Sequence, residues 1–194
     1  IIDGERETGV TIMRVIRALD AGPMLLQART AILDDETYGE LALRLSELGA
    51  LTLVEALSLV ELRKAMEEPQ DDSLATYAPK VDRTMTRIDW ELDARGVSRT
   101  IRAYDPKPGA LTTLHGQEVK LFGARPAPRT VSTPPGTVDS IGRDGMIVAC
   151  GEGAVRVAAV QPAGKRRLSP DEWARGRGVS EGDRFDADSH RLSF

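Results

Sequence analysis

Two short apolar runs joined by a tight turn constrain the fold of the first thirty residues. The turn, Asp20-Ala21-Gly22-Pro23, contains a glycine that can take a positive φ and a proline that fixes φ on its exit. The apolar residues on either side are Thr11, Ile12, Met13, Val15, Ile16, Met24, Leu25 and Leu26. Runs of this length predict a buried strand before and after the turn. Asp20 would then lie on a loop between strands of an α/β sheet, a common place for chemistry, although a turn carboxylate is more often structural.

A long amphipathic helix is predicted next, between Thr37 and Met66. Thr37 and Glu40 have the spacing of a capping box, and acidic residues precede them, which favours a helix N-terminus here. Apolar residues recur at intervals of three and four along the segment, so one face of the helix is expected to be buried. These residues are Leu41, Leu45, Leu48, Leu53, Leu57 and Val60. Gly49 interrupts the pattern and predicts either a kink or a split into two helices.

A change in composition and charge marks a boundary at residues 67–85. This segment is acidic, contains proline and lacks periodicity, so it is predicted to be an exposed linker. Residues 1–85 carry 9 Lys/Arg and 16 Asp/Glu, whereas residues 86–194 carry 17 and 14, for net charges of −7 and +3. Such asymmetry hints at a polyanionic partner for the basic half, although a solvated surface explains so small an excess equally well.

Short helices and strands after the linker predict a small domain over residues 86–194. Asp93, as N-cap, and Pro106 bound a short helix. Five strands separated by Gly-rich turns follow at residues 110–114, 118–122, 138–141, 146–150 and 155–160. Ser169 and Pro170 begin a last helix as its N-cap and first helical residue. Five short strands with small helices predict a small β-barrel of the OB type.

Several phrases of the sequence, in the same order, resemble the folate-dependent formyltransferase family. They are Glu7–Met13 with Leu19–Met24, Arg87–Trp90 with Ile101–Ala103, and Gln161–Lys165 followed by Arg166 and Arg167. The last two phrases are similar to the branch of the family that acts on methionyl-tRNA. The resemblance runs with gaps over nearly the whole chain. It implies the end of a Rossmann-like α/β catalytic domain in residues 1–66, followed by an all-β, OB-like tRNA-binding domain in residues 86–194.

The resemblance assigns the chemistry to Asp20. In the family, the matching Asp belongs to an Asn, His and Asp set that transfers the formyl group of 10-formyltetrahydrofolate to an amine. Ala21 and Gly22 would then line the folate pocket. The family's Asn and His are expected before residue 1, because the only histidines, His115 and His190, lie far downstream. The chain is therefore expected to be the C-terminal part of a longer enzyme and to be inactive alone.

A run of three cations, Lys165, Arg166 and Arg167, is the candidate tRNA contact. Adjacent cations after a strand and a turn can project together toward phosphates, although charge alone would equally fit a solvated loop. Weaker candidates, each with a structural or solubilising explanation, are Arg102, Arg143, Arg156 and Trp90. Trp90 could stack on a base, but a Trp beside a linker more often anchors packing.

The composition disfavours several other kinds of site. No stretch is apolar enough to span a bilayer, and no Cys/His/Asp cluster has metal-ligand spacing, so neither a membrane segment nor a metal is predicted. The single cysteine, Cys150, lies in an apolar run and fits a reducing compartment. The resemblance to the formyltransferase family implies a cytoplasmic monomer that formylates initiator methionyl-tRNA. The alternatives are a sugar-nucleotide amine formyltransferase, which the basic run argues against, and an RNA-binding module without chemistry.

Overall fold

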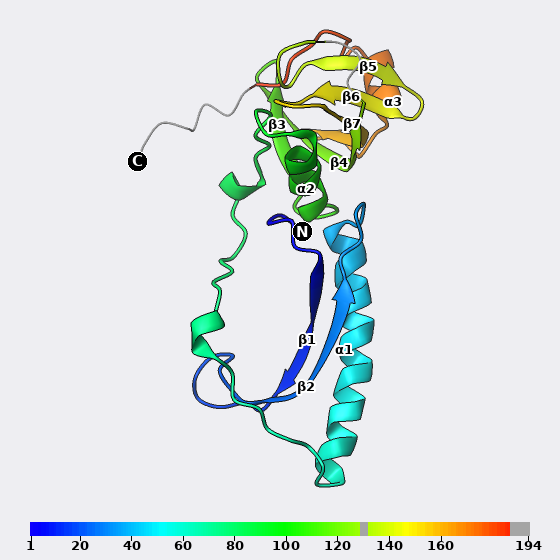
Figure 1. The fold of residues 1–194 in the computed structure, drawn as a ribbon. Helices are drawn as coiled ribbons and strands as arrows, with labels where there is room; N and C mark the ends of the chain where they lie inside the picture. Colours follow the sequence, from blue (N-terminus) through cyan, green and yellow to red (C-terminus); the bar gives the residue numbers. More distant parts are fainter. Residues whose placement is uncertain (129–131, 187–194) are drawn as a thin grey trace. The chain divides into compact units, whose positions relative to one another are not determined.

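The computed structural model describes residues 1–128 and 132–186 of the chain (Figure 1). His190, one of the two histidines, lies outside the described residues. The chain divides into two compact units. The hairpin–helix unit consists of residues 5–34 and 40–80, and the sheet unit of residues 1–4, 35–39 and 81–194. Two short segments from the first forty residues therefore belong to the sheet unit.

An antiparallel pair of strands and one helix build the hairpin–helix unit. β1 (Glu7–Met13) pairs with β2 (Met24–Ala31), so the two strands on either side of the Asp20 turn are present. Neither contains a fully buried residue, contrary to the prediction, because a lone pair of strands leaves one face uncovered. Val15 and Ile16 lie in the connecting loop with exposed side chains, so their apolar character does not mark a strand.

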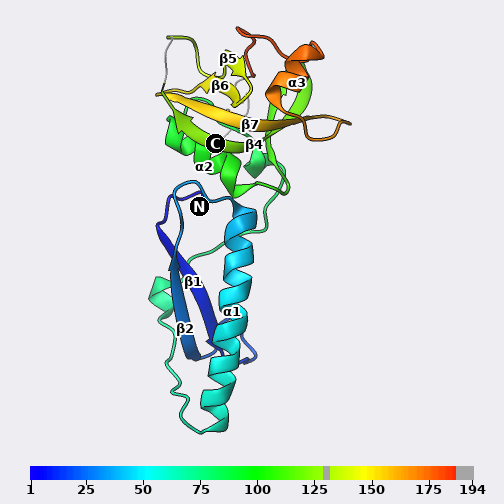
Figure 2. The same ribbon diagram turned by 90° about the vertical axis from the view of Figure 1, so that its right-hand side faces the viewer.

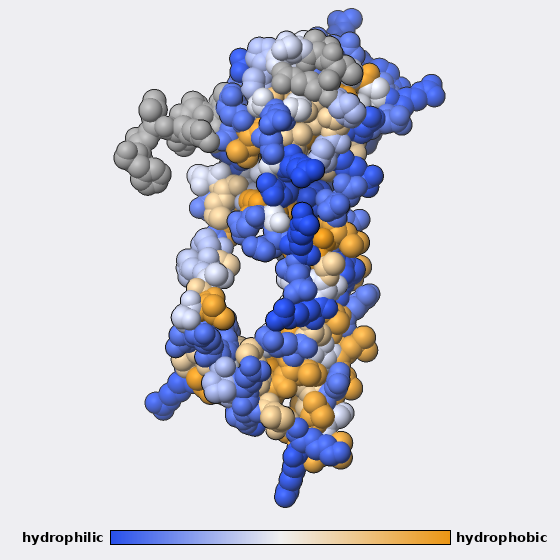
Figure 3. All heavy atoms as spheres, in the orientation of Figure 1, coloured by the Kyte–Doolittle hydropathy of each residue, from blue (hydrophilic) through white to orange (hydrophobic). Residues whose placement is uncertain are grey.

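α1 (Tyr38–Glu61) runs alongside the hairpin as one helix (Figures 1 and 2), and Gly49 does not split it. The buried residues of α1 are Leu41, Thr52 and Ala56. The C-terminal part of the predicted apolar stripe is exposed, at Leu53, Leu57 and Val60. Two short strands are too narrow to cover a whole helix face, so hydrophobic side chains gather on the surface of α1 (Figure 3).

The segment predicted as a linker is fastened at both ends. Glu68 exchanges two backbone hydrogen bonds with Met24 at the start of β2, with N···O distances of 2.7 and 2.9 Å. Near the other end, Arg83 donates a hydrogen bond to the carboxylate of Glu118 in the sheet unit. Between these contacts, residues 75–80 form neither helix nor strand and are exposed. The whole predicted segment, residues 67–85, is exposed, as expected.

Five antiparallel strands form one sheet in the sheet unit, in the order β3-β4-β7-β6-β5. The strands are β3 (Ala110–Leu114), β4 (Gln117–Ala127), β5 (Val138–Gly142), β6 (Gly145–Ala149) and β7 (Ala154–Pro162). Two helices accompany them, α2 (Ala94–Ala103) and α3 (Pro170–Arg175). The five predicted strands and both predicted helices are therefore present, and β4 is longer than predicted.

Local chemistry at the ends of these elements matches the sequence prediction. The Asp93 carboxylate accepts a hydrogen bond from the Gly96 N–H at 2.7 Å and caps α2. Ser169 caps α3 in a capping box with Glu172. The turn between β3 and β4 contains His115, at a φ of 50°, and a glycine that is also at positive φ.

The sheet does not close into the predicted barrel through strand pairing. β3 and β5 are its edges, and they do not pair with each other within the described ranges. The segment after α3 bonds to both edges instead. The Val138 N–H donates to the Asp183 carbonyl at 2.8 Å, and the Asp186 N–H donates to the Thr113 carbonyl at 2.9 Å. Because irregular chain takes up the edge hydrogen bonds, five short strands leave an open sheet.

The core of the sheet unit is built around two stacked rings. The Trp90 and Phe185 ring centroids lie 5.4 Å apart, and the Trp90 indole N–H donates to the Thr112 hydroxyl at 3.1 Å. Both rings are buried, so Trp90 anchors packing and offers no face to a base. Cys150 is buried in the same core. Across the described ranges, no helix has the length and apolar character needed to cross a membrane.

Candidate functional site

Asp20 lies in the exposed loop between β1 and β2, at a φ of 51°. Gln70 holds the backbone of this loop, because its side-chain amide donates to the carbonyl oxygens of Asp20 at 2.8 Å and of Gly22 at 2.7 Å. The Arg14 N–H donates to the Pro23 carbonyl at 3.0 Å and closes the base of the loop. The backbone is thus fixed while Asp20 stays open to solvent, as a residue that contacts a substrate requires.

Gly22 is required at this turn for a different reason than the predicted one. The residue in the left-handed region is Asp20, and Gly22 is not among the glycines at positive φ. Gly22 is buried, and a Cβ there would lie 1.7 Å from the carbonyl oxygen of Arg14. Close approach of two backbone segments therefore demands glycine. Ala21 is exposed beside Asp20, so these two are the accessible members of the predicted trio.

A second contact fastens the same loop to the segment after α1. The Arg14 guanidinium donates to the Glu67 carboxylate at 2.7 Å. Together with Gln70, this pair attaches residues 67–70 to the loop that carries Asp20. Gln70 is the site residue that sequence reasoning missed. No local pattern signals that a glutamine in an acidic, irregular segment bonds to a turn 50 residues earlier.

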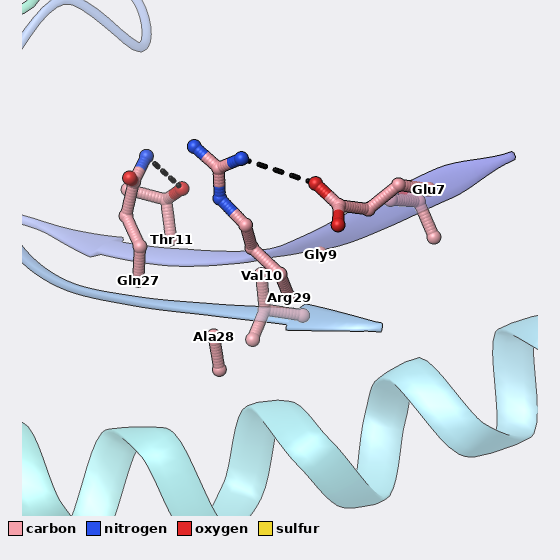
Figure 4. A pocket seen from close by; sticks show the side chains of 8 residues that line it. Glu7, Gly9, Val10, Thr11, Gln27, Ala28 and Arg29 are labelled. Carbon is pink, nitrogen blue, oxygen red and sulfur yellow. Dashed lines mark hydrogen bonds and ion pairs between the residues drawn. The ribbon is translucent and has the colours of Figure 1, made fainter. Parts of the chain in front are cut away.

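A pocket lies on the face of the hairpin that points away from α1 (Figure 4). On this face the Arg29 guanidinium donates to the Glu7 carboxylate at 3.1 Å. The Gln27 amide donates to the Thr11 hydroxyl at 3.2 Å beside it. These polar groups pair with one another across β1 and β2, and none of the predicted site residues lines the pocket.

The three predicted tRNA contacts lie together in one loop, residues 163–167, between β7 and α3. Two backbone hydrogen bonds between Val160 and Leu168, at 2.9 and 2.8 Å, close the base of this loop. The Gln161 amide donates to the Lys165 carbonyl at 3.0 Å. The loop backbone therefore has a defined conformation.

Lys165 and Arg166 differ in what they contact. Lys165 is exposed, and in the part of the chain that the structure describes its ammonium has no hydrogen-bond or ion-pair partner. The Arg166 guanidinium donates to the Glu172 carboxylate of α3 at 3.2 Å. The Ser169 N–H bond, and then the Arg166 contact, lower the pKa of Glu172 below its ordinary value. Lys165 thus remains available to an outside anion, whereas Arg166 is already engaged at the surface.

Arg167 is held against the sheet. Its guanidinium carbon lies 3.4 Å from the centroid of the Phe122 ring, and its Nη2 lies 3.5 Å from Oδ1 of Asp105. The other carboxylate oxygen of Asp105 accepts a hydrogen bond from the Gly123 N–H at 2.9 Å. Phe122 and Asp105 are both buried. The side chains of the three consecutive cations therefore lie in three different environments.

The weaker sequence candidates are explained by the fold or remain surface charges. Arg102 is buried and donates to the Glu36 carbonyl at 2.8 Å, so its role is structural. Arg143 and Arg156 are exposed. His115 Nε2 lies 3.2 Å from Oδ2 of Asp183. No group of three His, Cys, Asp or Glu residues in the described ranges could hold a metal ion.

Comparison with known proteins gives the class of this molecule. The formyl transferase C-terminal domain matches residues 80–178, and the formyl transferase domain matches residues 1–57. The chain belongs to the formyl transferase family. The first match ends before the segment 67–85 that sequence composition marks as a boundary, and the second begins within that segment, at residue 80.

Individual proteins of known name are similar to most of this chain. The chain is 39% identical to the methionyl-tRNA formyltransferase of Nitrosospira multiformis over 187 residues, 96% of this chain and 60% of that protein. It is 42% identical to that of Methylococcus capsulatus over 173 residues, 89% of this chain and 56% of that protein. Among solved structures, HypX from Aquifex aeolicus, in complex with tetrahydrofolic acid, has a TM-score of 0.73 at 24% identity, over 100% of this chain and 34% of that one. The chain thus spans 56–60% of the length of these curated relatives.

Proposed function

We propose that this chain acts in transferring the formyl group of 10-formyltetrahydrofolate to the amino group of methionine on initiator tRNA. The similarity to two proteins named methionyl-tRNA formyltransferase, at 39% and 42% identity over most of this chain, carries the proposal. In this scheme residues 1–66 form the end of the catalytic domain and residues 67–85 a linker. Residues 86–194 form a tRNA-binding domain related to OB-like barrels. The working molecule is a cytoplasmic monomer.

The chemistry assigns Asp20 a role in proton transfer. The amino nitrogen forms a bond to the formyl carbon, and the bond from that carbon to the folate nitrogen breaks. The amino nitrogen loses a proton and the folate nitrogen gains one, so positioned acids and bases accelerate the reaction. In the family an Asn stabilises the formyl oxygen, and an Asp matching Asp20 orients a His. An exposed carboxylate on a backbone fixed by Gln70 suits that role.

The folate donor is assigned to the same turn. Ala21 is exposed next to Asp20 and is available for direct contact. Gly22 is buried and contributes by letting the turn pass close to Arg14, so it shapes the pocket wall. The family match supports a folate donor. HypX, which shares the fold, was solved in complex with tetrahydrofolic acid.

The tRNA partner is assigned to the loop that carries Lys165, Arg166 and Arg167. The loop lies in the half of the chain whose net charge is +3, and Lys165 is exposed there with no partner in the described residues. Phosphate contacts from such cations position a nucleic acid without reading its sequence.

A formylation assay of the full-length protein tests the proposal. Purified protein is given 10-formyltetrahydrofolate with either initiator methionyl-tRNA or a nucleotide-linked amino sugar. Formation of formyl-methionyl-tRNA alone is the expected result. Formylation of the amino sugar alone would favour the sugar-nucleotide alternative. Binding of tRNA with no formylation of either acceptor would leave an RNA-binding module and overturn the enzymatic assignment.

A further inference from the structure

Arg167 differs from its two neighbours because two buried residues from separate parts of the sheet unit hold it. The Phe122 ring, in β4, lies under the guanidinium at 3.4 Å. Asp105, in the connection between α2 and β3, approaches the guanidinium at 3.5 Å and is itself 7% exposed. Asp105 is fixed in turn by the Gly123 N–H. The side chain of Arg167 therefore ties the 163–167 loop to the body of the sheet.

The same contacts argue against a direct role for Arg167 in binding an anion. The Arg167 side chain is 42% exposed, but to turn its guanidinium fully toward a phosphate outside the sheet it would have to give up its contact with the face of the Phe122 ring. The nearly buried carboxylate of Asp105 would then lose its cation, which is unfavourable in a site shielded from water. Lys165, two residues earlier, has neither constraint.

We propose that Arg167 is a positioning residue that anchors the 163–167 loop, and that Lys165 is the cation that this loop presents to the phosphate backbone of RNA. Of the three consecutive cations, one then contributes a full phosphate contact, Arg166 is partly neutralised by Glu172, and Arg167 contributes none. The assignment of Lys165 rests on the proposed function of the loop in binding tRNA. The anchoring by Arg167 does not.

The anchor is tested without RNA by amide hydrogen exchange over residues 163–167 in the full-length protein. Arg167→Ala and Arg167→Lys are compared with Arg143→Ala, which removes one exposed charge elsewhere in the sheet unit. Lysine keeps the charge but lacks the planar fork that stacks and pairs at once. Both Arg167 variants should exchange faster in this loop, and Arg143→Ala should match the parent. Unchanged exchange in the Arg167 variants would overturn the anchor.

Binding of unacylated initiator tRNA over a salt series tests the division of roles. Lys165→Ala should flatten the slope of log K against log salt by about 0.9 for the lost phosphate contact. Arg167→Ala and Arg167→Lys should both weaken binding alike, by about tenfold, because a loop without its anchor loses the one charge-assisted contact that Lys165 makes. Parent-like binding by Arg167→Lys, with a flattened slope for Arg167→Ala, would make Arg167 a phosphate ligand and overturn the proposal.

A second variant, and the combination of the two measurements, separate failure of the anchor from failure of the proposed function. Asp105→Asn removes the anchor from its other side and should raise exchange in the same loop, which covers the case in which an Arg167 variant does not fold. If the parent protein does not bind tRNA, the proposed function fails, while faster exchange in the Arg167 variants would still establish the anchor. If tRNA binds but Lys165→Ala leaves the salt slope unchanged, the assignment of Lys165 fails and the proposed function stands.

Discussion

The side-chain amide of Gln70 donates a hydrogen bond to the carbonyl oxygen of Asp20 at 2.8 Å, across 50 residues of sequence. A second bond from the same amide, to Gly22 at 2.7 Å, holds both sides of the turn. The backbone of Asp20 is at positive φ, a conformation that is uncommon for non-glycine residues and that Asp tolerates better than most. Gln70 thus supplies part of what keeps the candidate catalytic carboxylate in place.

Replacing Gln70 by Ala in the full-length protein should lower kcat by up to about a hundredfold, the cost of misplacing a catalytic group by about an ångström. The affinity for tRNA should not change, because the turn lies outside the proposed RNA loop. Steady-state formylation kinetics measure the first quantity. Gln27→Ala, which removes another exposed glutamine amide from the hairpin, is the matched control and should keep a normal kcat. A normal kcat for Gln70→Ala would show that the turn holds itself.

Replacing Asp20 by Asn in the full-length protein should lower kcat by about a hundredfold or more, the usual scale for a positioned proton-transfer group. Asparagine has nearly the same shape and tolerates positive φ, so the turn should survive. Thermal unfolding of the variant should therefore match that of the parent. If kcat stays near normal while stability falls, Asp20 is a structural turn residue.

Elements governed by local chemistry were predictable from sequence. The Asp93 cap, the Ser169 capping box and the turn at His115 all depend on residues within four positions of one another. In each case a side chain or a backbone φ preference satisfies neighbouring backbone groups, so a short window of sequence contains the whole interaction.

Features that depend on distant pairing were not predictable in the same way. Asp183 and Asp186, in the segment after α3, form backbone hydrogen bonds with the edge strands β5 and β3. The sheet therefore stays open and does not form the expected barrel. The stripe of α1 ends in exposed residues such as Leu57, because burial depends on what packs against the helix. The sequence pattern does not distinguish Arg167 from Lys165, because Phe122 and Asp105, which hold Arg167, are distant from it in sequence.

Limited proteolysis should cut first within residues 75–80. This stretch lacks helix and strand, whereas Glu68 and Arg83 on either side are hydrogen-bonded to other segments. Tyr77, with 90% of its surface exposed, should be the first chymotryptic site, and the buried Tyr104 should resist as an internal control. Mass spectrometry of early fragments gives the position. Early cleavage inside β4 or β7 would contradict a compact sheet unit.

The contact between Arg83 and Glu118 should make a small contribution to stability that disappears in acid. A hydrogen bond from Arg83 lowers the pKa of Glu118 below its ordinary value of 4.5. A carboxyl whose pKa is lower in the folded state stabilises the fold above its unfolded pKa and loses that effect as pH falls through its folded pKa. The Glu118 side chain is 37% exposed, so the effect should stay below about 1 kcal/mol.

Melting temperatures of the parent and of Glu118→Gln at two pH values check this. The parent should melt higher at pH 7, and the difference should disappear as the pH falls through the folded-state pKa of Glu118 and its carboxyl becomes protonated. A difference between parent and Glu118→Gln that is the same at both pH values would mean that shape, and not charge, accounts for it.

Replacing Phe185 by Ala should destabilise the sheet unit by about 3–5 kcal/mol, the usual cost of removing a buried aromatic ring. Phe185 is fully buried, and its ring stacks on Trp90 with 11° between the ring planes. Its N–H also donates to the Gly136 carbonyl, so the ring and the backbone together hold the irregular segment against the sheet.

Phe185→Leu keeps most of the apolar volume and should cost less. Urea unfolding followed by Trp fluorescence measures both variants, since Trp90 reports on the ring beside it. An equal, small loss of stability for Ala and Leu would mean that the segment is held by its backbone hydrogen bonds and that the stacked ring adds little.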